Sequence, residues 1–403
     1  MISIEEARQT IAAKIAPLAP VRTPLGRLAG GILRQDVVAD ATYPPVDRSM
    51  MDGYAVSADD PSEHFNIVME IPAGTLPERQ LQRGECARIF TGAALPEGAS
   101  RVIPQEDVDR DGGTMKPHRR DGPSFVRPRG AEAQLGEILL RPGTVLGGAE
   151  LAILAQVGCV EPLASPIPRI GHVVTGDELI DPSKTPEPGK IRDSNCSLLC
   201  GLLAACHMEG VAQGRFSDDF PKLLSACSSL SDPAQFGADL VLISGGASVG
   251  EYDFGARILR DLGFEIHFEK VNLRPGKPLI FGTRGKQAAF VIPGNPVSHF
   301  VCFHLAIRLA LERFRGAESA MACIEMELGG VDKLEGNPRE TFCPATVVVR
   351  EGRLLALPRR WSSSGDTFAL AGTNALIRLA SNSPPVAPGE CVRVLLLDAP
   401  VAG

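Results

Sequence analysis

Between residues 168 and 315 the sequence alternates short apolar segments with longer segments in which apolar residues recur every three or four positions. The short segments include RIGHVV, DLVLI and AAFVI, and the longer ones include CSLLCGLLAAC and FGARILRDLG. Strands that alternate with helices in this way are typical of βαβ units, which place helices on both faces of a parallel sheet. The alternation therefore predicts a doubly wound α/β domain built on a parallel sheet.

The rest of the chain predicts that this domain is part of a multidomain α/β plus β protein. Ser3, followed by acidic and periodic apolar residues, predicts a capped amphipathic helix over 3–15. The chain contains 42 glycines and 33 prolines among 403 residues, which favours many turns over one long helical bundle. We expect four regions: a discontinuous N-terminal helical and linker domain at 1–45 and 145–167, a β-rich domain at 46–144, the α/β domain at 168–316, and a small C-terminal β domain at 317–403.

Composition excludes several classes of protein. The formal net charge of −7 argues against a duplex-DNA-binding surface, which needs an excess of clustered Lys and Arg. Apolar runs are too short for a membrane span, and Glu5 and Glu6 stand where a signal peptide carries positive charge. The ten cysteines form no C-x-x-C pair, which is typical of thiols in a reducing compartment. We therefore expect a cytoplasmic protein without nucleic-acid or membrane partners.

Carboxylates follow three predicted strands of the α/β domain. Glu178, Asp218 and Asp253 each come shortly after a short apolar segment. Ligands of open α/β sheets bind beyond the carboxyl ends of the strands, and neighbouring carboxylates there are typical of Mg²⁺ sites completed by substrate phosphates. The pattern predicts a magnesium site. The alternative for Asp218 is that it only caps the helix that begins near Phe220.

A glycine-rich segment, Ser-Gly-Gly-Ala-Ser-Val-Gly, follows the strand DLVLI. Its backbone N–H groups are suited to a phosphate or another anion, although the same residues also suit a tight turn between strand and helix. The spacing matches neither the Walker A loop nor G-x-G-x-x-G. Asp193, Ser194 and Asn195 precede another predicted helix, where they can cap the helix and contact a ligand.

Two proline-framed turns complete the candidate site. In FEKVNLRPGKPLIFG, the prolines fix a turn that holds Arg274 and Lys277 together, with Lys270 just before it. Such a turn suits an oxyanion. The second turn, Pro-Gly-Asn-Pro, places Pro293 before and Pro296 at the start of a predicted helix that includes residues 300–311.

These segments together resemble the molybdopterin molybdenumtransferase family, whose members insert molybdenum into molybdenum cofactor and include the E domain of gephyrin. The resemblance is collinear and runs from the N-terminus to about residue 315, and more weakly beyond. It is carried by the motifs YPPVDRSMMDGYAV (43–56), RIFTGAALPEGASRVIPQEDV (88–108), VVTGDEL (173–179), RDSN (192–195), LVLISGGASVGEYDF (240–254), LRPGKPLIFG (273–282) and VIPGNPVSHF (291–300).

The resemblance implies a role for each motif residue. The implied catalytic residues are Asp52, Thr91, Glu178, Asp218 and Asp253, of which the last three also hold the metal. The implied substrate-binding residues are Asp193, Ser194, Asn195, Gly245, Gly246, Ser248, Lys270, Pro293 and Pro296. Molybdate is assigned to Arg274, Lys277, Arg339 and Ser364, although the C-terminal segment departs from the family pattern at Pro344 and in Trp-Ser-Ser-Ser-Gly (361–365).

The family reaction then becomes the expected function. It takes adenylylated molybdopterin and molybdate, cleaves the adenylate in a Mg²⁺-dependent step, and releases AMP and molybdenum cofactor. The resemblance also implies an elongated homodimer with its cleft between subunits, and transient contact with the molybdopterin adenylyltransferase and acceptor molybdoenzymes. The alternatives are a catalytically impaired paralogue that carries or scaffolds the pterin, a tungstate-inserting variant, and, more distantly, a sugar-phosphate or nucleotide enzyme.

Overall fold

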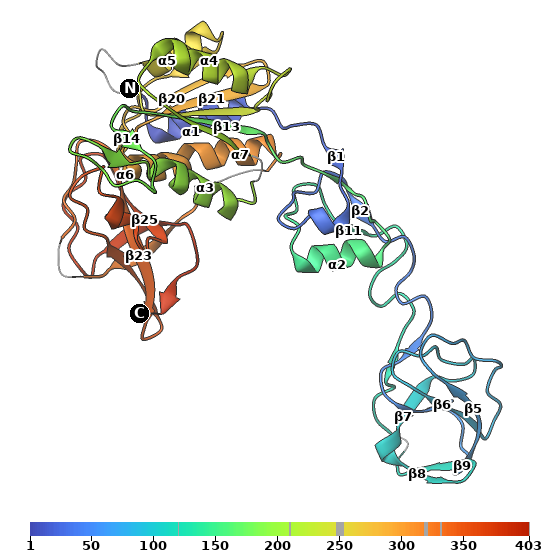
Figure 1. Cartoon of the computed structure of the whole chain (residues 1–403). Helices are drawn as coiled ribbons and strands as arrows, with labels where there is room; N and C mark the ends of the chain where they lie inside the picture. The colour runs from blue at the N-terminus through green and yellow to red at the C-terminus, as the bar shows by residue number, and fades with distance from the viewer. Residues whose placement is uncertain (120, 209–210, 247–253, 318–320, 331–332, 403) are drawn as a thin grey trace. The chain divides into compact units, whose positions relative to one another are not determined.

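The computed structural model describes residues 1–403 except 120, 209–210, 247–253, 318–320, 331–332 and 403. The chain divides into two compact units (Figure 1). Unit 1 consists of Met1–Thr23, Gly30–Arg34 and Leu163–Gly403, and unit 2 consists of Pro24–Ala29 and Gln35–Pro162. In the described part of the chain, none of the helices has the length and apolar character needed to cross a membrane.

Unit 1 is built on a six-stranded sheet with the order β16-β13-β17-β21-β20-β18. Its strands are β13 (Ile170–Thr175), β16 (Val211–Phe216), β17 (Leu240–Ser244), β18 (Glu265–Phe268), β20 (Ile280–Arg284) and β21 (Gln287–Ile292). The first four strands in this order are parallel, as predicted. β20 is antiparallel to β21, and β18 to β20, so the prediction of a wholly parallel sheet is wrong at this edge. Only Gly285 and Lys286 separate β20 from β21, and a two-residue connection closes a hairpin, whereas a parallel connection needs a dozen residues or more.

Helices cover both faces of this sheet, as the alternating pattern predicted (Figure 1). They are α1 (Ile4–Lys14), α3 (Asn195–Ala205), α4 (Phe220–Ser231), α5 (Phe254–Asp261), α6 (Pro296–Cys302), the π-helical turn η3 (Phe303–Ile307) and α7 (Arg308–Phe314). Successive side chains of β17 point to opposite faces, so Leu240 and Leu242 pack with α1, α3, α6 and α7, whereas Val241 and Ile243 pack with α4 and α5.

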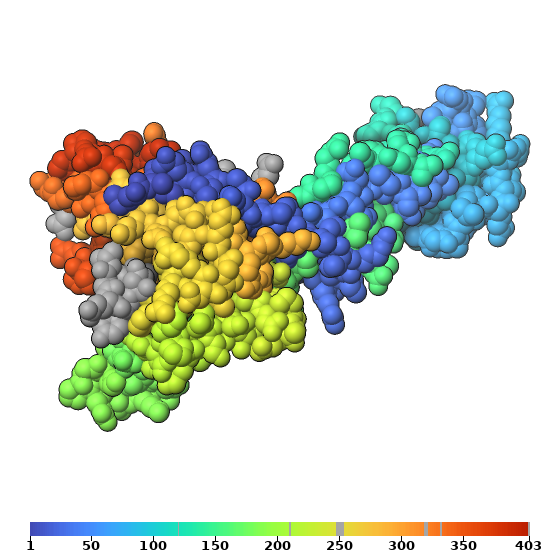
Figure 2. All heavy atoms as spheres, turned by 90° about the horizontal axis from the view of Figure 1, so that it is seen from above, coloured from blue at the N-terminus to red at the C-terminus, as the bar shows by residue number. Residues whose placement is uncertain are grey.

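The predicted N-terminal helix forms with the predicted cap. Ser3 Oγ accepts a hydrogen bond from the backbone N–H of Glu6, and the Glu6 carboxylate accepts one from the backbone N–H of Ser3. Ile2 N donates to Lys270 O at 3.3 Å, which ties this segment to the α/β sheet region. Figure 2 shows the dark-blue N-terminal residues beside the yellow residues of the same unit. The helix is therefore part of the unit 1 core, through Ile4 and Ile11.

The C-terminal part of unit 1 is built on a second sheet, of seven strands. It contains β22 (Cys323–Leu328), β23 (Glu340–Arg350), β24 (Arg353–Pro358), η4 (Thr367–Leu370), β25 (Ala375–Leu379), β26 (Cys391–Leu396) and β27 (Val401–Ala402). A short strand, β19 (Leu273–Arg274), belongs to the α/β sequence region but pairs with β23 of this sheet. Two small ladders complete the unit: β14 (Leu179–Ile180) with β15 (Ile191–Arg192), and β1 (Val21–Arg22) with β12 (Leu163–Ala164).

Unit 2 is rich in β structure, as its short apolar runs between turns predicted. Its six-stranded sheet has the order β7-β4-β6-β5-β9-β8. The strands of this sheet are β4 (Gly53–Val56), β5 (Phe65–Ile71), β6 (Glu85–Ile89), β7 (Arg101–Pro104), β8 (Val108–Asp111) and β9 (Thr114–Pro117). The remaining elements are η1 (Leu25–Arg27), β2 (Val37–Val38), β3 (Arg48–Ser49), η2 (Gln105–Asp107), β10 (Val126–Arg127), β11 (Ile138–Leu140) and α2 (Gly148–Gln156).

Candidate functional site

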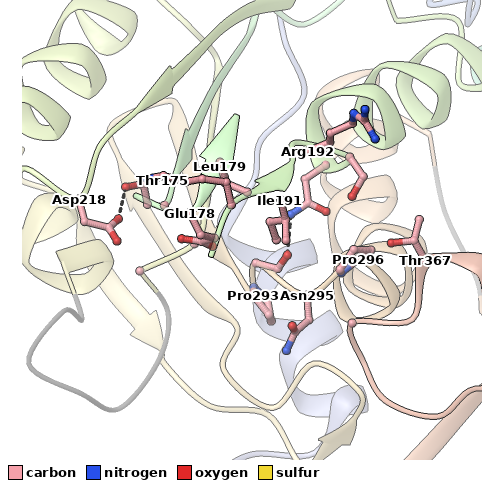
Figure 3. Close-up of a pocket in the computed structure, with 18 of the residues that line it drawn as sticks. Thr175, Glu178, Leu179, Ile191, Arg192, Asp218, Pro293, Asn295, Pro296 and Thr367 are labelled. Atoms are coloured by element: carbon pink, nitrogen blue, oxygen red, sulfur yellow. Dashed lines mark hydrogen bonds between the residues drawn. The ribbon is translucent and has the colours of Figure 1, made fainter. Parts of the chain in front are cut away.

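A cavity of about 840 Å³ lies at the carboxyl ends of the parallel strands of unit 1. Thr175 ends β13, Asp218 follows β16, Gly245 follows β17 and Pro293 follows β21, and all four line the cavity. Thr175, Asp218 and Pro293 are labelled in Figure 3. Segments far apart in the sequence meet here because the carboxyl ends of parallel strands lie at the same edge of a sheet. The cavity is therefore where an open α/β sheet is expected to bind a ligand.

Asp218 is held in the cavity wall by a neighbouring strand end. Thr175 Oγ1 donates a hydrogen bond to Asp218 Oδ1 at 2.5 Å, drawn as a dashed line in Figure 3, and the Asp218 N–H donates to Asp177 Oδ1 at 3.1 Å. The cap of α4 is instead Asp219, whose Oδ1 accepts from Lys222 N at 3.2 Å. The capping alternative for Asp218 is therefore wrong, and its carboxylate faces the cavity.

The cavity has two acidic side chains of the kind that binds Mg²⁺ together with substrate phosphates. Glu178 lines the same cavity as Asp218, so two carboxylates offer the hard oxygen ligands that Mg²⁺ prefers. A Cβ at Gly176 would lie 2.7 Å from Glu178 Oε2, so the glycine leaves room for this carboxylate. Within the described ranges there is no group of three His, Cys, Asp or Glu arranged to hold a metal by themselves. Asp253, the third predicted ligand, lies outside the described residues.

The glycine-rich loop after β17 starts with Gly245, which the fold requires to be glycine, and Gly246, whose positive φ favours glycine. Gly245 and Gly246 have φ angles of +99° and +62°, and a Cβ on Gly245 would lie 2.5 Å from Thr175 O. Both glycines line the cavity, which agrees with a role in ligand binding as well as with a tight turn. Ser248 lies outside the described residues.

In the segment before α3, one residue caps the helix and two residues line the cavity. Asp193 is buried, and its Oδ1 accepts from Cys196 N at 3.1 Å, so it caps the helix. Ser194 and Asn195 line the cavity. Asn195 Nδ2 donates to Gly294 O at 2.6 Å, which ties α3 to the Pro-Gly-Asn-Pro turn, while Asn195 Oδ1 is buried without a hydrogen-bond partner.

A second, smaller cavity of about 250 Å³ is lined by three cationic residues. Arg274 and Lys277 from the first proline-framed turn, together with Arg339 and Ser364 from the C-terminal part, all line it. Parallel pairing of β19 with β23 brings these segments together, because Arg274 lies opposite Thr341, two residues after Arg339. All four residues that the resemblance assigned to molybdate therefore meet in one small cavity, despite the departures from the family pattern in this region.

The structure adds residues that sequence reasoning missed. Ser298 and Trp361 line the small cavity, and the Arg274 guanidinium carbon lies 5.3 Å from the centre of the Trp361 ring, a cation–π geometry. Trp361 is the only tryptophan of the chain, which was an available signal, whereas nothing in the local sequence marks Ser298. Pro278, Pro293 and Asn295 line both cavities, so the two cavities share a wall.

Besides Asp193, three predicted site residues that the structure describes lie outside the two cavities. Asp52 and Thr91 belong to unit 2, where Asp52 Oδ1 accepts hydrogen bonds from Thr91 N and Oγ1, both at 2.8 Å. The Thr91 backbone and side-chain hydrogen bonds lower the pKa of Asp52 below its ordinary value, because they stabilise the carboxylate form. Lys270 is exposed and is not among the described residues that line either cavity.

Family comparisons match almost the whole chain. Residues 2–158 match the MoeA N-terminal region (domain I and II), residues 171–313 a probable molybdopterin binding domain, and residues 332–397 the MoeA C-terminal region (domain IV). These matches agree with the multidomain α/β plus β fold predicted from the sequence.

Individual relatives give the same answer. The chain is 34% identical to a molybdopterin molybdenumtransferase of Nostoc sp., over 91% of this chain and 86% of the relative. It is 31% identical to one of Bacillus subtilis, over 91% and 87%. Among solved structures, a molybdopterin biosynthesis MoeA protein from Pyrococcus horikoshii superposes with a TM-score of 0.82 at 26% identity, covering 98% of this chain and 100% of that one. The chain belongs to the MoeA family of molybdopterin molybdenumtransferases.

Proposed function

We propose that this protein is a molybdopterin molybdenumtransferase, which takes adenylylated molybdopterin and molybdate and releases AMP and molybdenum cofactor. One observation carries the proposal: a cavity lined by Glu178 and Asp218, and also by Lys190 and Arg192, shares a wall with a small cavity lined by two arginines and a lysine. The first suits a phosphate-bearing substrate with its metal, and the second suits a tetrahedral dianion.

The large cavity supplies the groups for cleaving the adenylate. Hydrolysis adds one water across the phosphoanhydride, so that AMP leaves and the molybdopterin keeps its own phosphate. Glu178 and Asp218, with Asp253 as the third residue that the sequence assigns, would hold Mg²⁺, which when bound neutralises charge on the phosphates. Thr175 fixes the orientation of the Asp218 carboxylate, while Gly245 and Gly246 line the same cavity.

The small cavity supplies the groups for binding the oxyanion. Arg274, Lys277 and Arg339 provide positive charge and N–H donors, and the hydroxyl groups of Ser298 and Ser364 can donate further hydrogen bonds. Tungstate has the same shape and charge as molybdate, so this cavity accepts either anion. The shared wall of Pro278, Pro293 and Asn295 brings bound oxyanion close to the pterin substrate.

Three further features belong to the proposal. The protein acts as a homodimer with a cleft formed by both subunits, as the resemblance implies. It works in the cytosol, which is supported by ten cysteines that form no C-x-x-C pair. It receives its substrate from the molybdopterin adenylyltransferase and passes its product to acceptor molybdoenzymes through transient contacts.

The test is a reaction of the purified protein with adenylylated molybdopterin, Mg²⁺ and molybdate, followed by AMP release and by reconstitution of a cofactor-free molybdoenzyme. We expect Asp218→Asn to lower the rate of AMP release at least about 100-fold, because it removes a charge from the metal-binding wall. Asp219→Asn is the matched control. Asparagine caps a helix as well as aspartate does, so its activity and stability should stay near those of the wild type.

The outcomes distinguish an enzyme from a carrier or scaffold of the pterin. Equal activity of the Asp218→Asn variant and the wild type contradicts the role of this carboxylate. Tight pterin binding by a wild-type protein that releases no AMP contradicts the enzyme and supports the carrier or scaffold.

A further inference from the structure

Phe368 is the most exposed large apolar side chain in the described part of the chain. Its exposed fraction is 89%, and it lines the mouth of the large cavity from η4. An aromatic ring left in water forgoes the free energy that burial in a core provides. A ring presented to solvent at the rim of a binding cavity is therefore a candidate contact for a ligand.

The backbone that carries Phe368 is held in place on both sides. The Asp366 carboxylate accepts hydrogen bonds from the backbone N–H and the hydroxyl of Ser362, both at 3.1 Å. Val297 N donates to Ser364 O at 3.0 Å, which ties the loop to α6, and Ala369 is buried. Phe368 is thus exposed on an anchored turn, so the position of its backbone is set before a ligand binds.

The same loop lines both cavities in sequence order. Ser362, Ser363 and Ser364 line the small cationic cavity, and Gly365, Thr367 and Phe368 line the large one. The segment that lines the small cavity therefore continues directly into the segment that carries Phe368. In molybdopterin the metal binds to two sulfur atoms carried next to the pterin ring, so the pterin is the part of the substrate that must lie close to molybdate.

We infer that Phe368 binds the substrate by stacking on the pterin ring system of adenylylated molybdopterin, and so positions its dithiolene beside the small cavity. This inference rests on the proposed function. Flat heteroaromatic rings stack on exposed aromatic side chains, and removing such a side chain weakens binding by about tenfold or more. Glu178 and Asp218 would then hold the Mg²⁺ that neutralises the phosphates. Phe368 would distinguish a substrate with a pterin ring from a smaller phosphate ester.

Phe368→Ala should raise the KM for adenylylated molybdopterin roughly tenfold, because the stacking contact is lost. Phe368→Tyr keeps a flat ring and should restore the wild-type KM. Direct titration by calorimetry should show the same weakening for molybdopterin that lacks the adenylate, with AMP affinity unchanged. Molybdate affinity, followed by the fluorescence of Trp361 in the small cavity, should also be unchanged. Leu354→Ala is the matched control, since Leu354 is 40% exposed on β24 and does not line either cavity.

Three results would overturn the inference. An unchanged KM and unchanged molybdopterin affinity in Phe368→Ala would show that the ring does not touch the substrate. Weakened AMP binding with normal molybdopterin binding would assign the ring to the adenine instead. A change from dimer to monomer in light scattering would place Phe368 in a subunit interface. Failure of the proposed function differs from failure of this inference, because in the first case the wild type itself releases no AMP. The molybdopterin titrations would still show whether Phe368 contributes to binding.

Discussion

Adjacent carboxylates after β16 lie in different environments. Asp219 caps α4 and pairs with Lys222 Nζ at 2.8 Å, whereas Asp218 accepts a hydrogen bond from Thr175 and lines the large cavity. Lysines show a similar division, because Lys277 lines the small cavity and Lys270 lies outside both. The two aspartates have the same side chain, as do the two lysines. Only the position that the backbone gives each side chain decides whether it lines a cavity.

At the residue scale, Lys277→Ala is expected to weaken molybdate binding about tenfold, because it removes one charge-assisted contact with a dianion. The fluorescence of Trp361, the sole tryptophan, reports the binding directly, since its ring lies against Arg274 in the same cavity. The KM for adenylylated molybdopterin should change less than twofold.

Lys286→Ala is the control for this measurement, because Lys286 is an exposed lysine in the turn between β20 and β21. A molybdate affinity that is the same in Lys277→Ala, Lys286→Ala and the wild type would contradict the role of the small cavity.

The helical run α6-η3-α7 departs from regular α-helical geometry. The sequence predicted one helix that starts at Pro296 and includes residues 300–311, but residues 303–307 form a π-helical turn inside it. Arg8 Nη1 donates to Leu305 O at 2.6 Å, which satisfies a carbonyl of this turn. His299 and His304 lie in the same run with both ring nitrogens buried and without hydrogen-bond partners.

Burial of these imidazoles makes the stability of unit 1 depend on pH. Burial lowers the pKa of His299 to about 4 and of His304 to about 3, and burial of His172 in β13 lowers its pKa to about 3. In the unfolded chain each titrates near 6.5. The unfolded state therefore binds more protons below about pH 6.5, and the folded state loses stability as the pH falls from there toward 4.

At the element scale, we expect the free energy of unfolding to fall between pH 6.5 and 5, with each buried histidine adding up to about 1.4 kcal/mol per pH unit to the slope. His299→Leu removes one of these protons and should make the slope shallower, as measured by urea denaturation at several pH values. Val301→Ala, in the same helix, should lower stability by a similar amount at every pH. An identical slope for His299→Leu and the wild type would show that His299 does not take up a proton on unfolding.

At the scale of the whole molecule, the residues implied in catalysis divide between the two units. Asp52 and Thr91 belong to unit 2, while Glu178 and Asp218 belong to unit 1. The proposed homodimer offers a way to test which copy supplies which residue, since a symmetric dimer repeats every site twice.

Co-expression of Asp52→Asn and Asp218→Asn subunits tests this arrangement. If each site takes Asp52 from one subunit and Asp218 from the other, half of the dimers are mixed and one of the two sites in each is intact. AMP release should then return to about a quarter of the wild-type rate. Each variant expressed alone should be inactive. If both residues act within one subunit, the mixture stays as inactive as the separate variants, which contradicts the shared cleft.

Much of the fold and the candidate site followed from the sequence. The capping box of Ser3 and Glu6 involves residues three positions apart, so local spacing was enough to predict it. Strand and helix alternation predicted the covered sheet, and the positions after the strands predicted Thr175-Gly176-Asp177-Glu178 and Asp218 as one edge. These features depend on short-range periodicity and on the rule that parallel strands end together.

What only the tertiary structure decided is set by contacts between distant segments. The sequence by itself determined the elements, the motifs and the residue types of the candidate site. It did not determine the antiparallel edge of the sheet, the choice of Asp218 over Asp219 for the cavity, or the meeting of Ser298 and Trp361 with Arg274. The pairing of β19 with β23 joins residues more than sixty positions apart, and such a contact depends on packing and register that no local pattern encodes.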